Sequence, residues 1–199
     1  MTAHARPSLY TWLTQHSASR ASLLIAFVWG LAEATIFFIV PDVYLGFVAL
    51  FHWRQGLVAA LAAVLGAMLG GVLLYWLSIT NPSSVHELLL HIPLIKAAML
   101  NTVNEQMRAE GLFALVSGPL QGIPYKIYAV QAAEQQLPFL LFLLVTIPAR
   151  LERILPVALL GALLGVVFHK FVQRHAALVL SMYVLLWLGI YLLYFVAVR

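Results

Sequence analysis

The fold is decided by residues 21–53, ASLLIAFVWG LAEATIFFIV PDVYLGFVAL FHW. Its only Asp, Glu, Lys or Arg residues are Glu33 and Asp42. A straight membrane-crossing helix needs about 20 apolar residues, and this stretch is longer. Pro41 interrupts it, and a helix interior tolerates proline poorly. Two structures therefore fit: one long tilted helix, or a hairpin that enters and leaves on the same side. Pro41 and the two acids favour the hairpin.

The composition of the whole chain indicates an integral membrane protein. Of its 199 residues, 63% are hydrophobic and 9% are charged, against about 45–50% and about 25% in soluble domains. With 11 basic and 7 acidic side chains, a soluble fold of this size could not cover its surface. The abundant apolar residues exclude disorder. The net charge of +4 is spread along the chain and gives no sign of nucleic-acid binding.

Polar stretches divide the chain into three parts. Residues 1–20 are polar and are expected to form an amphipathic helix on the membrane surface. Residues 21–175 form the main membrane domain, and residues 176–199 hold a final crossing helix. Within the membrane domain we expect a hairpin over 21–51, a crossing helix over 56–80, interfacial helices over 85–111, a second hairpin over 112–135, crossing segments over 137–169 that are interrupted at 148–153, and a loop over 169–175.

Small residues recur on one face of the helix expected over 56–80. Gly66, Gly70 and Gly71 lie there among alanines, and such faces let helices pack closely in lipid. A proline-broken apolar segment followed by a glycine-bearing helix occurs twice, the second time ending with Gly161 and Gly165. Interrupted apolar segments at matching positions in two halves are typical of a transporter binding site at the membrane midplane.

Ionisable residues inside the apolar segments are the candidate site residues: Glu33, Asp42, Lys126, Arg150 and Arg153. Charges in membrane segments are costly and usually face a cavity or a partner. Ordinary roles exist for most of them. Asp42 could cap a helix, Lys126 could extend its charge to the membrane surface, and the two arginines could belong to a short polar loop.

The functional interpretation joins these groups in one shared wet pocket. Buried carboxylates can bind and release protons near neutral pH. Cationic side chains and the ends of broken helices can hold an anionic headgroup. We therefore expect Glu33 and Lys126 to face the same pocket, where protonation of Glu33 or Asp42 would free the basic groups for the headgroup.

Other chemistry has little support in the sequence. The chain has no cysteine, which excludes disulfides, thiolate metal sites and cysteine nucleophiles. His86 and His91 are five residues apart, a poor spacing for one metal site. No phosphate-binding glycine loop and no nucleophilic serine motif occurs. We expect no catalytic residue, no metal and no cofactor, and we expect the Trp and Tyr residues to lie mostly at the membrane interface.

Three short motifs occur in an order that resembles the DedA family, within the superfamily that carries the VTT (SNARE-associated) domain. They are Glu33 followed by Pro41-Asp42, the pattern Gly66-x-x-x-Gly70-Gly71-x-x-x-Tyr75, and Gly122-Ile123-Pro124-Tyr125-Lys126. The arginine-bearing segment 150–153 also fits. The likeness is strongest to the YqaA-type branch and covers roughly residues 22–170.

The resemblance implies an all-α integral membrane protein with two opposed re-entrant helical hairpins and several transmembrane helices, like an inverted-repeat transporter. It also implies a multi-pass protein of the bacterial inner membrane that moves a lipid phosphate, either undecaprenyl phosphate or a phospholipid, often in dependence on proton motive force. The expected partner is thus an anionic membrane lipid. Self-association is left open. The positions that match the family's essential acidic and basic sites are Glu33, Asp42, Lys126, Arg150 and Arg153.

The chain also departs from the family pattern. Phe38 and Val40 stand where the branch usually has further prolines, and Gln121 stands where many members have an arginine before the hairpin proline. These differences motivate an alternative function, that of a membrane assembly protein which keeps the fold without transport. A lipid-phosphate hydrolase is a third candidate, disfavoured because no nucleophile, base and cation occur together.

Overall fold

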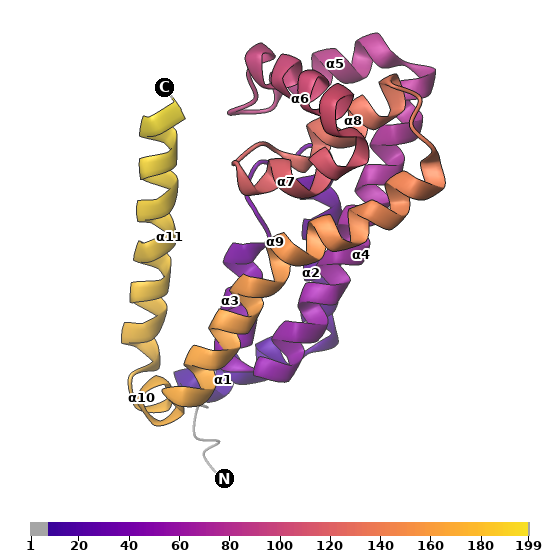
Figure 1. The fold of residues 1–199 in the computed structure, drawn as a ribbon. Coiled ribbons are helices and arrows are strands. Elements are labelled where there is room, and N and C mark those ends of the chain that lie inside the picture. Colours follow the sequence, from indigo (N-terminus) through magenta and orange to yellow (C-terminus); the bar gives the residue numbers. More distant parts are fainter. Residues whose placement is uncertain (1–7, 199) are drawn as a thin grey trace.

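The structure, a computed structural model, describes residues 8–198 and consists of helices joined by short loops (Figure 1). No β-strand occurs in this range, so the expectation of an all-α protein is confirmed. The elements in chain order are α1 (Leu9–Ser17), α2 (Arg20–Thr35), α3 (Asp42–Phe51), α4 (Trp53–Thr80), α5 (Pro82–His91), α6 (Ala97–Glu110), the 3-10 turn η1 (Gly111–Phe113), α7 (Ala114–Leu120), α8 (Tyr125–Glu134), α9 (Phe139–Val167), α10 (His169–Arg174) and α11 (Ala176–Val198).

Two helices of the described chain, α4 and α11, are long and apolar enough to cross a membrane. The 28 residues of α4 extend about 42 Å at 1.5 Å per residue, more than the roughly 30 Å of a bilayer's hydrocarbon core. Half of the most apolar window of α4 is buried, but only 6% of the corresponding window of α11. The bare apolar surface of α11 indicates association with a membrane, because water-exposed proteins rarely leave so much apolar surface uncovered.

The segment 21–51 folds as two helices joined by a loop. The one long tilted helix, which the sequence also allowed, does not form. Helix α2 ends at Thr35, residues 36–41 form the loop, and α3 begins at Asp42. The side-chain amide of Gln55, at the start of α4, donates a hydrogen bond of 3.1 Å from Nε2 to the backbone carbonyl of Ser19. The chain therefore returns after α3 to the end of the molecule at which α2 began.

The small-residue face of α4 packs directly on α2. A Cβ atom added to Gly66 would overlap the backbone carbonyl of Phe27, and one added to Gly30 would overlap that of Ala63. The same kind of contact joins α3 and α9, where Gly161 lies against the backbone of Gly46. Glycine allows both helix pairs to approach backbone to backbone, which strengthens the dispersion contacts that hold helices together in lipid.

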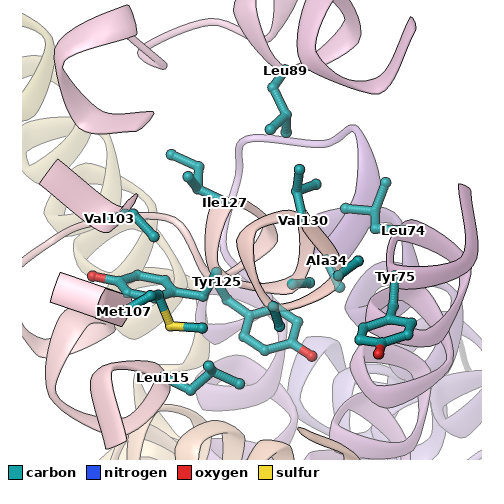
Figure 2. Packing of buried hydrophobic residues seen from close by; sticks show 14 of the residues in the cluster. Ala34, Leu74, Tyr75, Leu89, Val103, Met107, Leu115, Tyr125, Ile127 and Val130 are labelled. Carbon is teal, nitrogen blue, oxygen red and sulfur yellow. The ribbon is translucent and has the colours of Figure 1, made fainter. Parts of the chain in front are cut away.

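Helices from both halves of the chain surround α8, whose residues Tyr125 to Ala133 are all buried. Figure 2 shows Ile127 and Val130 of α8 beside side chains from α4, α5 and α6. The neighbours labelled there that come from these three helices are Leu74, Tyr75, Leu89, Val103 and Met107. Helices α5 and α6 together cover most of the predicted interfacial segment 85–111, although α5 already begins at Pro82, and each buries apolar residues on this core.

Two expectations about the later segments are wrong. Residues 148–153 do not interrupt the chain, because α9 runs as one helix of 29 residues through Pro148 and Pro156. Proline removes one backbone hydrogen bond, which neighbouring helices in a membrane protein can tolerate. Residues 169–174 form α10 and not a loop. At the N-terminus, α1 lies within the predicted surface segment, and residues 1–7 of that segment lie outside the described chain.

Gly66→Ala tests the close packing of α2 on α4. The new methyl group meets the Phe27 carbonyl, so we expect the free energy of unfolding to fall by about 1–3 kcal/mol. Gly189→Ala on α11 is the matched control, because a Cβ atom there has open space and should add about 0.5–1 kcal/mol of helix stability. Thermal unfolding of both variants in detergent micelles checks this. Equal stability of the two variants would contradict the packing.

Candidate functional site

A cavity of about 220 Å³ lies where the 36–41 loop meets α8, α9 and α11. All five ionisable residues singled out in the sequence line it: Glu33, Asp42, Lys126, Arg150 and Arg153. They come from the last turn of α2, the first turns of α3 and α8, and the middle of α9. The fold thus brings together groups that are up to 120 residues apart, from Glu33 to Arg153, and the shared pocket expected for Glu33 and Lys126 is present.

Two ion pairs connect α2 and α3 to α9. Arg150 donates to the carboxylate of Glu33, and Arg153 donates to that of Asp42. The first pair is almost fully buried, whereas the side chain of Arg153 remains 33% exposed. Asp42 is the first residue of α3 and makes no side-chain cap to that helix. Pairing with Arg153 therefore replaces the ordinary capping role considered for Asp42.

Each pair leaves polar atoms unused. Oδ1 of Asp42 and Nε of Arg150 are buried and have no hydrogen-bond partner in the described part of the chain. Buried polar atoms are normally satisfied, so each exception needs an explanation. A ligand or water in the neighbouring cavity could satisfy both atoms without breaking either ion pair.

Lys126 forms a hydrogen bond with the 36–41 loop instead of an ion pair with a carboxylate. Its Nζ donates a hydrogen bond of 2.7 Å to the carbonyl oxygen of Phe37. The residue is only 2% exposed, so its charge does not extend to the molecular surface. Lys126 lies in the first turn of α8, where the helix dipole already contributes positive charge. This position favours a negatively charged group in the cavity.

The irregular 36–41 loop has its backbone groups paired by side chains from other helices. Besides Lys126, the indole of Trp29 donates to the carbonyl of Ile39 at 3.0 Å. The amide of Val40 donates to the hydroxyl of Tyr191 at 2.9 Å. Irregular backbone survives at membrane depth only where the protein or a water-filled cavity satisfies it. This loop meets that condition through α2, α8 and α11.

The loop before α8 and its first residue shape the other side of the cavity. Gly122 has a positive φ of 83°, and Pro124 sets the start of α8. The guanidinium of Arg150 lies 4.9 Å from the centre of the Tyr125 ring, a distance at which a cation is attracted to an aromatic face. The Tyr125 hydroxyl is 3.0 Å from that of Thr146. Tyr125 thus supports the guanidinium of Arg150 with the face of its ring.

Four of the predicted packing residues lie outside this cavity. Gly66 and Gly70 contact α2, and Gly71 contacts the hydroxyl of Tyr125. The hydroxyl of Tyr75 donates to the carbonyl of Leu137 at 2.6 Å and so ties α4 to the connection between α8 and α9. The other four predicted hairpin and packing residues line the cavity: Pro41, Gly122, Pro124 and Tyr125.

Sequence reasoning missed the contribution of α11. Tyr183, Trp187 and Tyr191 are four residues apart and therefore share one face of this helix. Trp187 and Tyr191 line the cavity, and the Tyr183 hydroxyl donates to the carbonyl of Val43 at 2.8 Å. We expected such aromatic residues to lie mostly at the membrane interface. The four-residue spacing is the signal that could have placed them against the rest of the protein.

No family model, curated protein or solved structure matches the chain. Within residues 8–198, no group of three or more His, Asp or Glu residues is placed to hold a metal ion. The arrangement of the side chains in the cavity is therefore what points to its function.

Arg150→Gln tests the buried pair with Glu33. The substitution leaves a buried carboxylate without its cation, which costs about 3–5 kcal/mol of stability. The double variant Glu33→Gln/Arg150→Gln removes both charges, and we expect it to regain most of that loss. Arg108→Gln, an exposed site on α6, is the control and should behave as the unchanged chain. Chemical or thermal unfolding in micelles measures all four proteins, and a double variant no more stable than Arg150→Gln would argue against coupling.

Proposed function

We propose that the chain is a multi-pass protein of the bacterial inner membrane that transports a lipid phosphate across the bilayer. The observation that supports this proposal best is the content of the cavity: three cations and two carboxylates within one buried space. The cations exceed the carboxylates by one, and Lys126 is the cation not used in an ion pair of the described chain. A singly charged phosphate headgroup would balance that excess.

The two ion pairs suggest how binding could be coupled to protons. A phosphate oxygen and a carboxylate compete for the same guanidinium donors, since both form charge-assisted hydrogen bonds with arginine. Protonation of Glu33 or Asp42 weakens its hold on Arg150 or Arg153. The freed arginine then binds the headgroup, and loss of the proton on the other side of the membrane restores the ion pair and releases the lipid.

The wall of the cavity on the α11 side suits the hydrocarbon chain of such a lipid. On the α11 side, the cavity is lined by Trp187, Ile190, Tyr191 and Tyr194. The rest of α11 exposes leucine and valine side chains. An acyl or prenyl chain could lie along this wall while its headgroup reaches the arginines, as the amphiphilic shape of the substrate requires.

We further propose that the α2–α3 and α7–α8 segments are re-entrant hairpins of an inverted repeat. Each segment changes direction at a proline-containing loop, and each is followed by a long glycine-bearing helix, α4 or α9. The first turns of α3 and α8 both supply a charged residue to the cavity. Such a pairing of broken segments around a central site is typical of transporters built from repeats.

One observation favours the alternative of a non-transporting assembly protein. Gln121, at the position where the family often has an arginine, lies 3.2 Å from the side chain of Gln106 on α6 and does not line the cavity. The site thus has one cation fewer than the resemblance implies. The residues that line the cavity include no Ser, Thr, Cys or His, so a hydrolase acting here would lack a serine, threonine, cysteine or histidine nucleophile.

Glu33→Gln and Asp42→Asn test proton-coupled transport. Each variant removes a carboxylate that can exchange protons, so we expect the transport rate under a pH gradient to fall by about 100-fold or more, the lower end of the usual contribution of a positioned proton-transfer group. The assay measures the accessibility of the headgroups of several lipid phosphates in proteoliposomes, with and without the pH gradient. Glu105→Gln, on the exposed face of α6, is the matched control.

Three results separate the candidate functions. An unchanged rate in both carboxylate variants would overturn the coupling mechanism. A lack of headgroup movement with every lipid, together with a stable partner in detergent pull-down and tolerance of Lys126→Ala, would favour the assembly protein. Release of inorganic phosphate from the lipid would indicate a hydrolase.

A further inference from the structure

One end of the molecule gathers basic side chains from segments far apart in the sequence. We call it the basic end and define it by four exposed residues: Arg20, Arg54, Lys170 and Arg174. Histidines 16, 52, 169 and 175 lie in the same segments. The chain has no Asp or Glu before residue 33, between residues 42 and 87, or after residue 152. None of the segments that form the basic end therefore contributes an acidic side chain.

Direct contacts hold these segments together. The Tyr10 hydroxyl of α1 is 3.4 Å from Nδ1 of His169 on α10. Leu13, Phe51 and Val172 share one buried apolar cluster that joins α1, α3 and α10. The hydrogen bond from the Gln55 amide to the Ser19 carbonyl adds the start of α4. Figure 1 shows α1 and α10 at the same end of the molecule.

The other end of the long helices has the opposite charge balance. Four exposed acidic residues lie on α5, α6 and α8: Glu87, Glu105, Glu110 and Glu134. The exposed cations of this end are Lys96, between α5 and α6, and Arg108 on α6. Figure 1 shows α5 and α6 at the end opposite α1 and α10. With Lys and Arg as +1 and Asp and Glu as −1, the basic end has a charge of +4 and this end has −2. Helix α4 connects them over about 42 Å at 1.5 Å per residue.

The basic end also has a hollow with suitable donors. It measures about 560 Å³ and lies between α1, the α3–α4 junction and the last turn of α9. The polar and aromatic side chains that line it are Tyr10, Phe51, His52, Trp53, Arg54 and His169. The guanidinium of Arg54 lies 5.1 Å from the centre of the Trp53 ring. A hollow with an arginine, two histidines and a hydroxyl, and with no carboxylate, suits an anionic headgroup.

We propose that the basic end lies against the cytoplasmic leaflet and that its hollow binds the phosphate headgroups of anionic lipids there. Lysine and arginine accumulate on the cytoplasmic side of membrane proteins, and the negative surface of that leaflet attracts them. The interfacial position also suits Trp12 and Trp53, which are both exposed at this end. This site is separate from the central cavity and does not depend on transport.

Lipid titration of the purified full chain in micelles tests the headgroup site. Phosphatidylglycerol should raise the melting temperature, and neutral phosphatidylcholine should not. In Arg54→Gln/Lys170→Gln the concentration of phosphatidylglycerol for half the effect should increase by about fivefold for each charge removed. Arg108→Gln at the opposite end is the matched control. An equal response to both lipids, an unchanged response in the double variant, or the same stabilisation by inorganic phosphate would overturn the site.

Cysteine labelling tests the orientation and can fail independently of the lipid titration. The chain has no cysteine, so single substitutions report without background. Gln173→Cys on α10 and Ser83→Cys on α5 replace exposed residues at the two ends. In intact bacteria, a membrane-impermeant maleimide should label Ser83→Cys at once, and Gln173→Cys only after the inner membrane is permeabilised. The reverse pattern would overturn the proposal.

Discussion

The structure depends on two ion pairs that join the end of α2 and the start of α3 to the middle of α9. Isolated charges at such positions would be costly, since a low dielectric penalises them strongly. Pairing Glu33 with Arg150 and Asp42 with Arg153 reduces that cost and fixes the position of α9. Because a well-packed apolar core would give comparable stability, the presence of the pairs is better explained by a site that needs its charges.

The same constraint explains the helices that surround the loop. Three backbone groups of the 36–41 loop are paired by the side chains of Trp29, Lys126 and Tyr191, which come from three different helices. Each of these side chains has to be placed by its own helix. The close packing of α2 on α4, which glycine permits, and the buried position of α8 are therefore conditions for the site as well as for the fold.

Sequence patterns predicted the helical class, the long apolar helices and the residues that meet in the cavity, because charge and proline are conspicuous against an apolar background. The pattern did not predict that α9 continues through Pro148, since the cost of a proline depends on neighbours that a sequence does not show. It also missed Tyr191, because an aromatic residue suits the membrane interface and a protein contact equally well. Tertiary contacts decide between these possibilities.

The balance of charged side chains changes from one end of the molecule to the other, in the direction of α4. The basic end has an excess of cations, the opposite end has an excess of acids, and the central cavity has five charges that nearly balance. Surface charges are screened within about 10 Å in salt, so the ends act on the lipid nearest to them. The buried groups are screened far less. A small change in the centre, such as one proton on Glu33, therefore has a larger electrostatic effect than the same change at either end.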